Sequence, residues 1–158
     1  MMGKYFPMFI DMEGRQVQVF GGGRIAARRV SVLLEFGAKV RVVAPKISEK
    51  LEELAWQKKN LVLEYRSYQS GELQEAEIVI AATNDATVND MIFRECRHKS
   101  IPVNVASEKE KCDFYFPGIV KEGDLIVGIT ASGENHRMAA EATERIGRLI
   151  KEDQAVDF

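Results

Sequence analysis

The chain has few cysteines, prolines and tryptophans: two, four and one, respectively, among 158 residues. The two cysteines, Cys96 and Cys112, are too few for a disulfide framework and are not spaced as metal ligands, so we expect free thiols and no metal site in a cytoplasmic protein. No apolar run approaches the roughly 20 residues that cross a bilayer, and residues 1–12 lack the core of a signal peptide. A formal charge of −2 gives no reason to expect nucleic acid or an anionic membrane as partner.

Three consecutive glycines lie between a short alternating strand and an amphipathic helix. Gly21 is suited to the tight turn after the strand, Gly23 leaves room for a pyrophosphate to approach the main chain, and Ala26 lets the helix pack close to the strand. On the helix, Ala26, Val30, Leu33 and Leu34 face inward, and Arg28, Arg29 and Glu35 face solvent. A glycine-rich turn alone is a weak signal, but the flanking strand and helix together predict a dinucleotide site at a helix N-terminus.

Strand-like and helix-like segments alternate from this turn to about residue 105. Expected strands cover residues 17–20, 39–43, 61–65, 77–82 and 101–105. Expected helices cover residues 24–36, a stretch that begins at Ser48, and residues 85–99, and residues 71–75 form a turn or one helical turn. This alternation implies right-handed βαβ crossovers. We therefore expect a Rossmann-type parallel sheet with helices on both faces.

The pattern changes after residue 112. Residues 114–116 and 125–130 are expected strands, the turn residues 121–124 separate them, and no helix lies between them. This predicts a small antiparallel β extension. A final helix at about 135–151 carries an apolar stripe that favours packing, here against a second subunit.

Several segments, in this order, resemble the precorrin-2 dehydrogenase family, the dehydrogenase module of siroheme synthase. They are residues 5–10, 21–29, 37–38, 42–45, 81–85 with Asn89, 103–105 and 112–117. The resemblance implies an NAD+-dependent oxidation of precorrin-2 to sirohydrochlorin in siroheme biosynthesis by a homodimer. It also implies an NAD-binding Rossmann domain at residues 1–112 and an extension at 113–158 that dimerises and closes the active site.

The resemblance assigns cofactor-binding residues at the ends of several strands. Gly21, Gly22, Gly23, Arg24 and Ile25 would hold the pyrophosphate, Ala44 and Pro45 would lie beside the adenosine ribose, and Thr83, Asn84 and Asn104 would border the nicotinamide. Many Rossmann proteins carry an acidic residue where this chain has Ala44 and Pro45. The choice between NAD and NADP therefore stays open, and Lys46 can tolerate a 2′-phosphate or be simply solvated.

The chain departs from the family at the expected proton-transfer residue. The family places an aspartate two residues beyond Val105, where this chain has Ser107. Because a serine hydroxyl is a poor base without a partner, Glu108 and Asp113 are alternative catalytic residues, although Glu108 also suits an exposed charged loop. The family aspartate is thought to serve iron insertion too, so whether Fe2+ is inserted stays open.

A second departure lies before the final helix, where residues 130–136 replace the family's glycine-rich turn. Ser132 and Asn135 keep its polar character, and Asn135 can cap the helix. Arg137 is a candidate ligand for a substrate with eight carboxylates, or an ordinary surface arginine.

Three functions fit these residues. The first is the dehydrogenase, with possible handover to other enzymes of the pathway. The second is a non-catalytic NAD- and tetrapyrrole-binding module that holds or transfers the intermediate, which Ser107 favours. The third is a nucleotide-sensing Rossmann regulator, which would not need the segment at 112–117 or the antiparallel extension.

Overall fold

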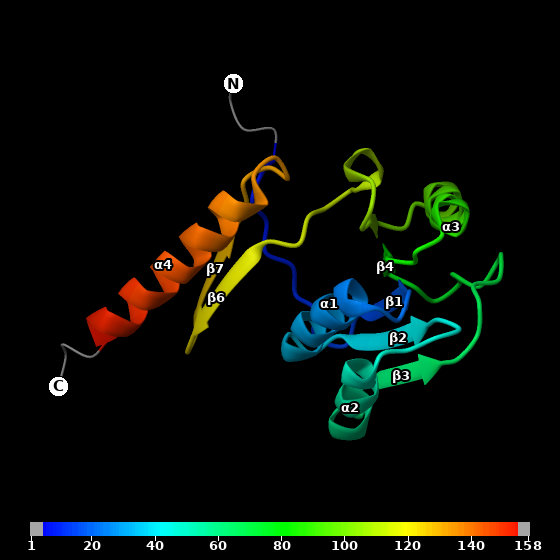
Figure 1. The fold of residues 1–158 in the computed structure, drawn as a ribbon, viewed down its shortest axis with the longest axis horizontal. Coiled ribbons are helices and arrows are strands. Elements are labelled where there is room, and N and C mark those ends of the chain that lie inside the picture. The colour runs from blue at the N-terminus through cyan, green and yellow to red at the C-terminus, as the bar shows by residue number, and fades with distance from the viewer. Residues whose placement is uncertain (1–4, 155–158) are drawn as a thin grey trace. The chain divides into compact units, whose positions relative to one another are not determined.

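The computed structural model describes residues 5–154, which form a five-stranded sheet, a two-stranded sheet and four α-helices (Figure 1). The strands are β1 (Gln16–Phe20), β2 (Lys39–Val43), β3 (Leu61–Glu64), β4 (Ile78–Ala81), β5 (Val103–Val105), β6 (Gly118–Glu122) and β7 (Leu125–Ile129). The helices are α1 (Arg24–Glu35), α2 (Glu49–Gln57), α3 (Ala86–Lys99) and α4 (His136–Gln154), and Lys109–Lys111 form a 3-10 turn.

The larger sheet is parallel and has the strand order β3-β2-β1-β4-β5. Its central strands, β1 and β4, are buried almost throughout. Phe20, Ala81 and Val103 share a core cluster with Ile92 and Cys96 of α3. Since side chains alternate across a strand, the opposite face is the one that α1 reaches, where Arg29 bonds Asn104 of β5. The predicted Rossmann-type fold with helices on both faces is confirmed.

The chain divides into two compact units. One is residues 10–114, with the parallel sheet and α1–α3, and the other joins residues 5–9 to residues 115–154. In the second unit Tyr5 and Tyr115 pack edge to face, with ring centroids 4.7 Å apart and hydroxyl oxygens 2.7 Å apart. The sequence places the domain boundary after residue 112, and the ends of both expected domains, residues 1–4 and 155–158, lie outside the described residues.

The antiparallel extension is present, but one of its predicted strands is displaced. Residues 114–116 are not a strand; instead β6 begins at Gly118 and pairs with β7 in the register Gly118↔Ile129 to Glu122↔Leu125. The hairpin turn is therefore Gly123 and Asp124, so Lys121 and Glu122, expected in the turn, end a strand. The aromatic run at 114–116 has strand-like composition, but strand formation depends on a pairing partner as well as composition.

The connection between β3 and β4 contains no α-helix and is fastened to α3 by a single carboxylate. Glu95 accepts hydrogen bonds from the Tyr68 hydroxyl and from the backbone N–H groups of Gly71 (3.0 Å) and Leu73 (3.3 Å), and it pairs with Lys99 at 3.7 Å. Burial raises the pKa of the Glu95 carboxyl, but these hydrogen bonds more than offset it, so the net pKa is lowered. Ionised Glu95 thus orders the loop that leads into the central strand β4.

We expect Glu95→Gln to destabilise the protein by about 2 kcal/mol at pH 7, because the amide weakens three charge-assisted hydrogen bonds, one of them to the buried N–H of Leu73. A lowered folded-state pKa gives stability that is present above the unfolded-state pKa of about 4.3 and is lost as the pH falls through the folded value. Urea denaturation of the wild type and the variant should therefore converge at acid pH. The exposed Glu75→Gln is the matched control, and an equal loss in it would contradict this account.

Candidate functional site

The glycine corner consists of residues 21–23. Backbone atoms of neighbouring loops lie close to Gly21 and Gly22, whereas Gly23 is open. Gly21 has φ +116° and donates to the Val43 carbonyl at 3.0 Å, and a Cβ on it would come 2.2 Å from the Ala82 oxygen. A Cβ on Gly22 would come 2.1 Å from the Lys46 oxygen. A Cβ on Gly23 would meet nothing within 4 Å. The loops after β1, β2 and β4 therefore pack together while leaving an approach to the main chain at Gly23.

The first turn of α1 suits an anionic group. Gly23 is the N-cap residue, no side chain caps the helix, and no acidic residue lies in the first turn. Arg24 and Ile25 at the first two helical positions are exposed. Uncapped N–H groups and the positive end of the helix dipole attract phosphate. These residues fit the pyrophosphate of a dinucleotide, in the place where the sequence predicts it.

The loop after β4 is held rigidly by Asn89, which is 1 % exposed. The Thr83 hydroxyl donates to the Asn89 Oδ1 atom at 2.7 Å, and the Asn89 amide also pairs with the backbone N–H and carbonyl of Thr83, both at 3.2 Å. Asp85 caps α3 by accepting from the backbone N–H of Thr87 at 2.8 Å. Thr83 is therefore fixed at the carboxyl edge of the sheet, with Asn84 exposed beside it.

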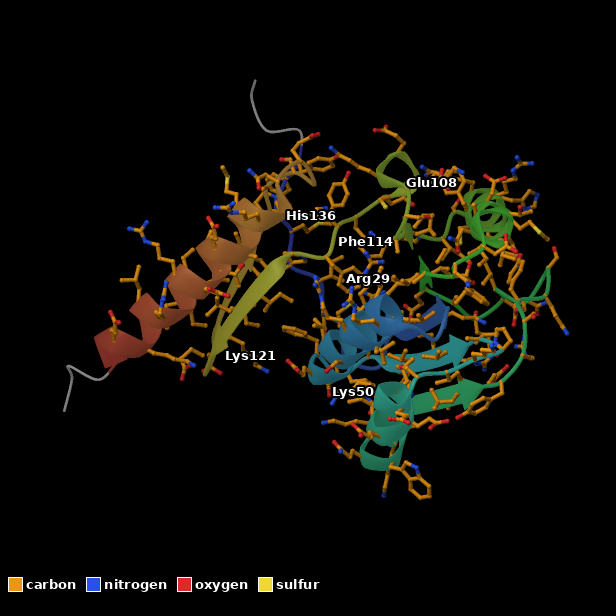
Figure 2. The ribbon with its side chains drawn as sticks, in the orientation of Figure 1. Arg29, Lys50, Glu108, Phe114, Lys121 and His136 are labelled. Carbon is orange, nitrogen blue, oxygen red and sulfur yellow. The ribbon has the colours of Figure 1, made fainter. Side chains whose placement is uncertain are left out.

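Asn104 has a different setting from the predicted cofactor residues Thr83 and Asn84, because it is only 2 % exposed and its side chain is bonded at both ends. Its oxygen accepts from Arg29 at 2.5 Å, and its nitrogen donates to the Phe114 carbonyl at 2.7 Å. Arg29 does not face solvent as the helix pattern predicts: it lies half-buried, and burial lowers its pKa. Figure 2 shows Arg29 and Phe114 in the same part of the first unit.

Sequence reasoning missed the Arg29–Asn104–Phe114 connection. A charged residue on an amphipathic helix is assigned to the solvent face by default, and only the hydrogen bond from Arg29 to Asn104 reveals the exception. Asn104 thus connects β5 with α1, through Arg29, and with Phe114 at the end of the first unit.

The three predicted catalytic residues fall at two different ends of β5. Ser107 is exposed and follows the carboxyl end, and Glu108 beside it is 37 % exposed and pairs with Lys111 at 2.8 Å. Asp113 instead accepts from the backbone N–H of Val103, the first residue of β5, at 3.0 Å, and pairs with Arg97 at 2.9 Å. The structure therefore brings Ser107 and Glu108 to the edge where the glycine corner lies, and Asp113 to the opposite end of the strand.

Lys111 links the Glu108 carboxylate to α3. Its ammonium group lies 2.8 Å from Glu108 and 2.9 Å from Asp90, and hydrogen bonds to these two carboxylates, Glu108 first, raise its pKa. The ion pairs of Lys111 with Glu108 and Asp90 hold the loop that follows β5 against α3.

The predicted substrate residues belong to the second unit. Asn135 accepts from the backbone N–H of Met138 at 2.9 Å, so the predicted cap of α4 is confirmed. Ser132 has φ +55° in the turn before it, and Arg137 is exposed and pairs with Glu141 at 2.7 Å. Exposed apolar side chains also lie on α4, Met138 at 59 % and Leu149 at 51 %.

The two thiols have different environments. Cys96 is fully buried, and burial raises its pKa to about 12. Cys112 is partly exposed, and its thiol donates to the carbonyls of Val105 (3.2 Å) and Glu108 (3.4 Å). Within residues 5–154 no group of three His, Cys, Asp or Glu side chains is placed to hold a metal ion. The same residues include no helix with the length and apolar character to span a membrane.

We expect a thiol reagent such as DTNB to modify Cys112 slowly in the native protein and to modify Cys96 only when the protein unfolds. The thiolate is the reactive form, and Cys96 is both unionised and inaccessible. Stopped-flow absorbance with Cys112→Ser, which leaves Cys96 alone, measures the second rate. A rapid reaction of Cys96 without denaturant would contradict the packing of α3 on the sheet.

Several known proteins are similar to this chain. Residues 8–118 match a family described as "Putative NAD(P)-binding". The chain is 40 % identical to the probable multifunctional siroheme biosynthesis protein HemA of Ruminiclostridium josui, over 91 % of this chain and 28 % of that protein. It is 35 % identical to the siroheme synthase of Nitrosococcus oceani, over 93 % of this chain and 31 % of that protein. The chain thus spans less than a third of the length of these relatives.

A solved structure named SirC, precorrin-2 dehydrogenase, has a similar fold, with a TM-score of 0.71 and 28 % sequence identity. The similarity covers 98 % of this chain and 71 % of that one. The resemblance noted from the sequence is therefore confirmed by relatives and by a solved structure. Because the family match extends over well more than half of the 158 residues, the chain belongs to this family of NAD(P)-binding proteins.

Proposed function

We propose that this protein is a precorrin-2 dehydrogenase that uses NAD+ to oxidise precorrin-2 to sirohydrochlorin in siroheme biosynthesis. The observation that carries the proposal is the similarity to SirC over 98 % of this chain, which includes the extension as well as the parallel sheet. The open approach at Gly23 supports it independently, because a dinucleotide needs close contact with the main chain there.

The residues of the first unit have separate tasks in this proposal. The N–H groups of the glycine corner and of Arg24 and Ile25 hold the pyrophosphate, and Ala44 and Pro45 border the adenosine ribose. Thr83, fixed by Asn89, and the exposed Asn84 border the nicotinamide end. Asn104 acts indirectly, by holding the segment after β5 through Arg29 and Phe114. When bound, NAD+ supplies the hydride acceptor.

Loss of a hydride from the substrate must be accompanied by loss of a proton, and Glu108 is our proposed proton acceptor. It is a partly exposed carboxylate at the carboxyl edge of the sheet, and it pairs with Lys111 at 2.8 Å. In this proposal Ser107, beside it in sequence, contacts the substrate. Asp113 is less suited, because both of its oxygens are engaged by Val103 and Arg97 at the other end of β5.

We also propose that Ser132, Asn135 and Arg137 contribute to binding the eight carboxylates of the substrate, and that the protein is a homodimer. The exposed Met138 and Leu149 on α4 support a second copy as the partner of that helix. Sedimentation measures the dimer directly. A monomer at micromolar concentration would exclude it.

An anaerobic assay tests the function. Purified protein, NAD+ and enzymatically made precorrin-2 should yield NADH and the absorbance of sirohydrochlorin, and added Fe2+ shows whether iron is inserted. The alternative, a module that binds and transfers the intermediate, is favoured by Ser107 at the family aspartate position. Binding of NAD+ and the tetrapyrrole without NADH formation would select that alternative.

A further inference from the structure

The ammonium group of Lys111 is held by three other side chains. It lies 2.8 Å from the Glu108 Oε2 atom, 2.9 Å from the Asp90 Oδ1 atom and 5.8 Å from the centre of the Phe93 ring. The Lys111 side chain is 25 % exposed, whereas an ordinary surface lysine keeps its charged end in water. Because Asp90 and Phe93 both belong to α3, that helix fixes the cation that pairs with Glu108.

The Asp90 carboxylate anchors this arrangement. Its Oδ1 atom accepts from Lys111, and its Oδ2 atom pairs with Arg94, one turn further along α3, at 2.8 Å. The hydrogen bond from Lys111 is the main cause of a lowered pKa at Asp90, and the bonds to Glu108 and Asp90 raise the pKa of Lys111. Both shifts favour the charged forms, so the Lys111–Asp90 pair persists at neutral pH.

The adjacent residue of α3 holds the other side of the candidate site. Asn89 fixes Thr83, at the proposed nicotinamide end of the cofactor, through hydrogen bonds of its side chain. Asp90, the next residue, reaches Glu108 through Lys111. Consecutive residues of one helix thus hold the loop after β4 and the loop after β5. A hydride and a proton that leave one substrate need acceptors at fixed positions relative to each other.

The main chain of the loop that carries Glu108, which Figure 2 labels, is held independently of the Lys111 ammonium group. The Glu108 backbone N–H donates to the Val105 carbonyl at 3.2 Å. The Glu108 carbonyl accepts from the backbone N–H of Lys111 at 3.1 Å and from the Cys112 thiol at 3.4 Å. The ammonium group therefore orients the Glu108 carboxylate rather than folding the loop. It bonds the Oε2 atom, and the Oε1 atom has no hydrogen-bond partner in the described part of the chain.

We propose that Lys111 is a positioning residue, which Asp90 of α3 anchors and which orients the Glu108 carboxylate toward the substrate. This role rests on the proposed function, in which the substrate loses a hydride to NAD+ and a proton to the Glu108 carboxylate, which becomes the carboxylic acid. A free glutamate side chain samples several rotamers, and a misplacement of about 1 Å can cost about 100-fold in rate. Lys111 acts only through Glu108, and it neither takes the proton nor binds the cofactor.

Anaerobic kinetics of NADH formation by Lys111→Met test this role. We expect kcat to fall about tenfold and KM to change by less than about threefold, because orientation is lost and substrate binding is retained. Lys111→Arg keeps a cation that can bond both carboxylates, so its kcat should stay within about threefold of the wild-type value. Asp90→Ala removes the anchor but not the pair with Glu108, and its kcat should fall about threefold.

The matched control is Arg94→Met, which changes the charge by the same amount on the same helix. Arg94 pairs with the other oxygen of Asp90, and its side chain is 77 % exposed. Its removal leaves the Lys111 contacts in place, so kcat should be unchanged. Equal losses in Arg94→Met and Lys111→Met would assign the effect to charge rather than orientation and would overturn the positioning role.

A double-mutant cycle separates positioning from a structural role. Because Lys111 acts through Glu108, adding Lys111→Met to Glu108→Gln should not lower kcat further. A merely structural role would lower kcat in both backgrounds. The reaction of Cys112 with DTNB should keep the wild-type rate in Lys111→Met, because this thiol bonds the Glu108 carbonyl and reports on the main chain of the loop. A faster reaction would show that the loop itself has moved, which contradicts a role in orientation alone.

The remaining outcomes separate the positioning role from the proposed function. Wild-type kcat in Lys111→Met, or a further loss in the double variant, would overturn the positioning role and leave the dehydrogenase standing. Full kcat in Asp90→Ala would overturn Asp90 as the anchor. No NADH formation by the wild-type protein would overturn the proposed function, and the positioning role with it.

Discussion

Gly23→Ala will fold with nearly the stability of the wild type and bind NAD+ at least tenfold more weakly, whereas Gly22→Ala will be defective in folding. Gly23 has φ −86°, which any residue adopts, and a Cβ there meets nothing within 4 Å, so we expect a stability change below about 1 kcal/mol. The added methyl group would instead occupy the space through which the pyrophosphate reaches the main chain.

For Gly22→Ala we expect the opposite result, a loss of stability. Its Cβ would lie 2.1 Å from the Lys46 oxygen and 2.8 Å from the Ile47 Cα, and both contacts are backbone. The loop after β2 would have to move, at a cost of about 1–3 kcal/mol. Thermal unfolding and nucleotide titration of both variants separate the two roles. Wild-type affinity in Gly23→Ala would show that the pyrophosphate does not approach at this residue.

The glycine corner illustrates what the sequence alone establishes. Its assignment needed only local information: a strand pattern, consecutive glycines and a helix pattern, each within 15 residues. The roles expected for Gly21 and Gly23 agree with the positive φ and close contact of the first and the open surroundings of the second. The parallel sheet was predictable for a similar reason, because each strand and each crossover helix has its own periodicity.

Relations between distant segments were not predictable in this way. Asp113 and Glu108 are five residues apart and both are candidate bases by sequence, and only the bonds of Asp113 to Val103 and Arg97 place it at the amino end of β5. The position of β6 depends on the register with β7 rather than on aromatic content. Arg29 is the same kind of case, since its partner Asn104 is 75 residues away.

Both the rigid and the open parts of the candidate site depend on backbone packing between loops. Ala82, Lys46 and Val43 contact the glycine corner through main-chain atoms, and the buried side chain of Asn89 fixes Thr83. Main-chain contacts hold position independently of surface side chains, so the exposed residues Arg24, Asn84 and Ser107 and the partly exposed Glu108 can be substituted without disturbing the fold.

The largest effect on catalysis is expected from Glu108→Gln. Gln keeps the size of the side chain and cannot accept the proton, so kcat should fall by about 100- to 1000-fold, the range typical of a lost general base. KM should change by less than about threefold, because the substrate is still bound. NADH formation under anaerobic conditions measures both parameters.

Two neighbouring variants make this result specific. Glu110→Gln removes an exposed carboxylate from the same loop and should leave kcat unchanged. Asp113→Asn should lower the unfolding temperature, because it weakens the bonds to Val103 and Arg97, without the loss of kcat seen for Glu108→Gln. Full activity in Glu108→Gln would exclude this carboxylate as the proton acceptor. A large loss of kcat in folded Asp113→Asn would instead indicate Asp113, at the amino end of β5, as the proton acceptor.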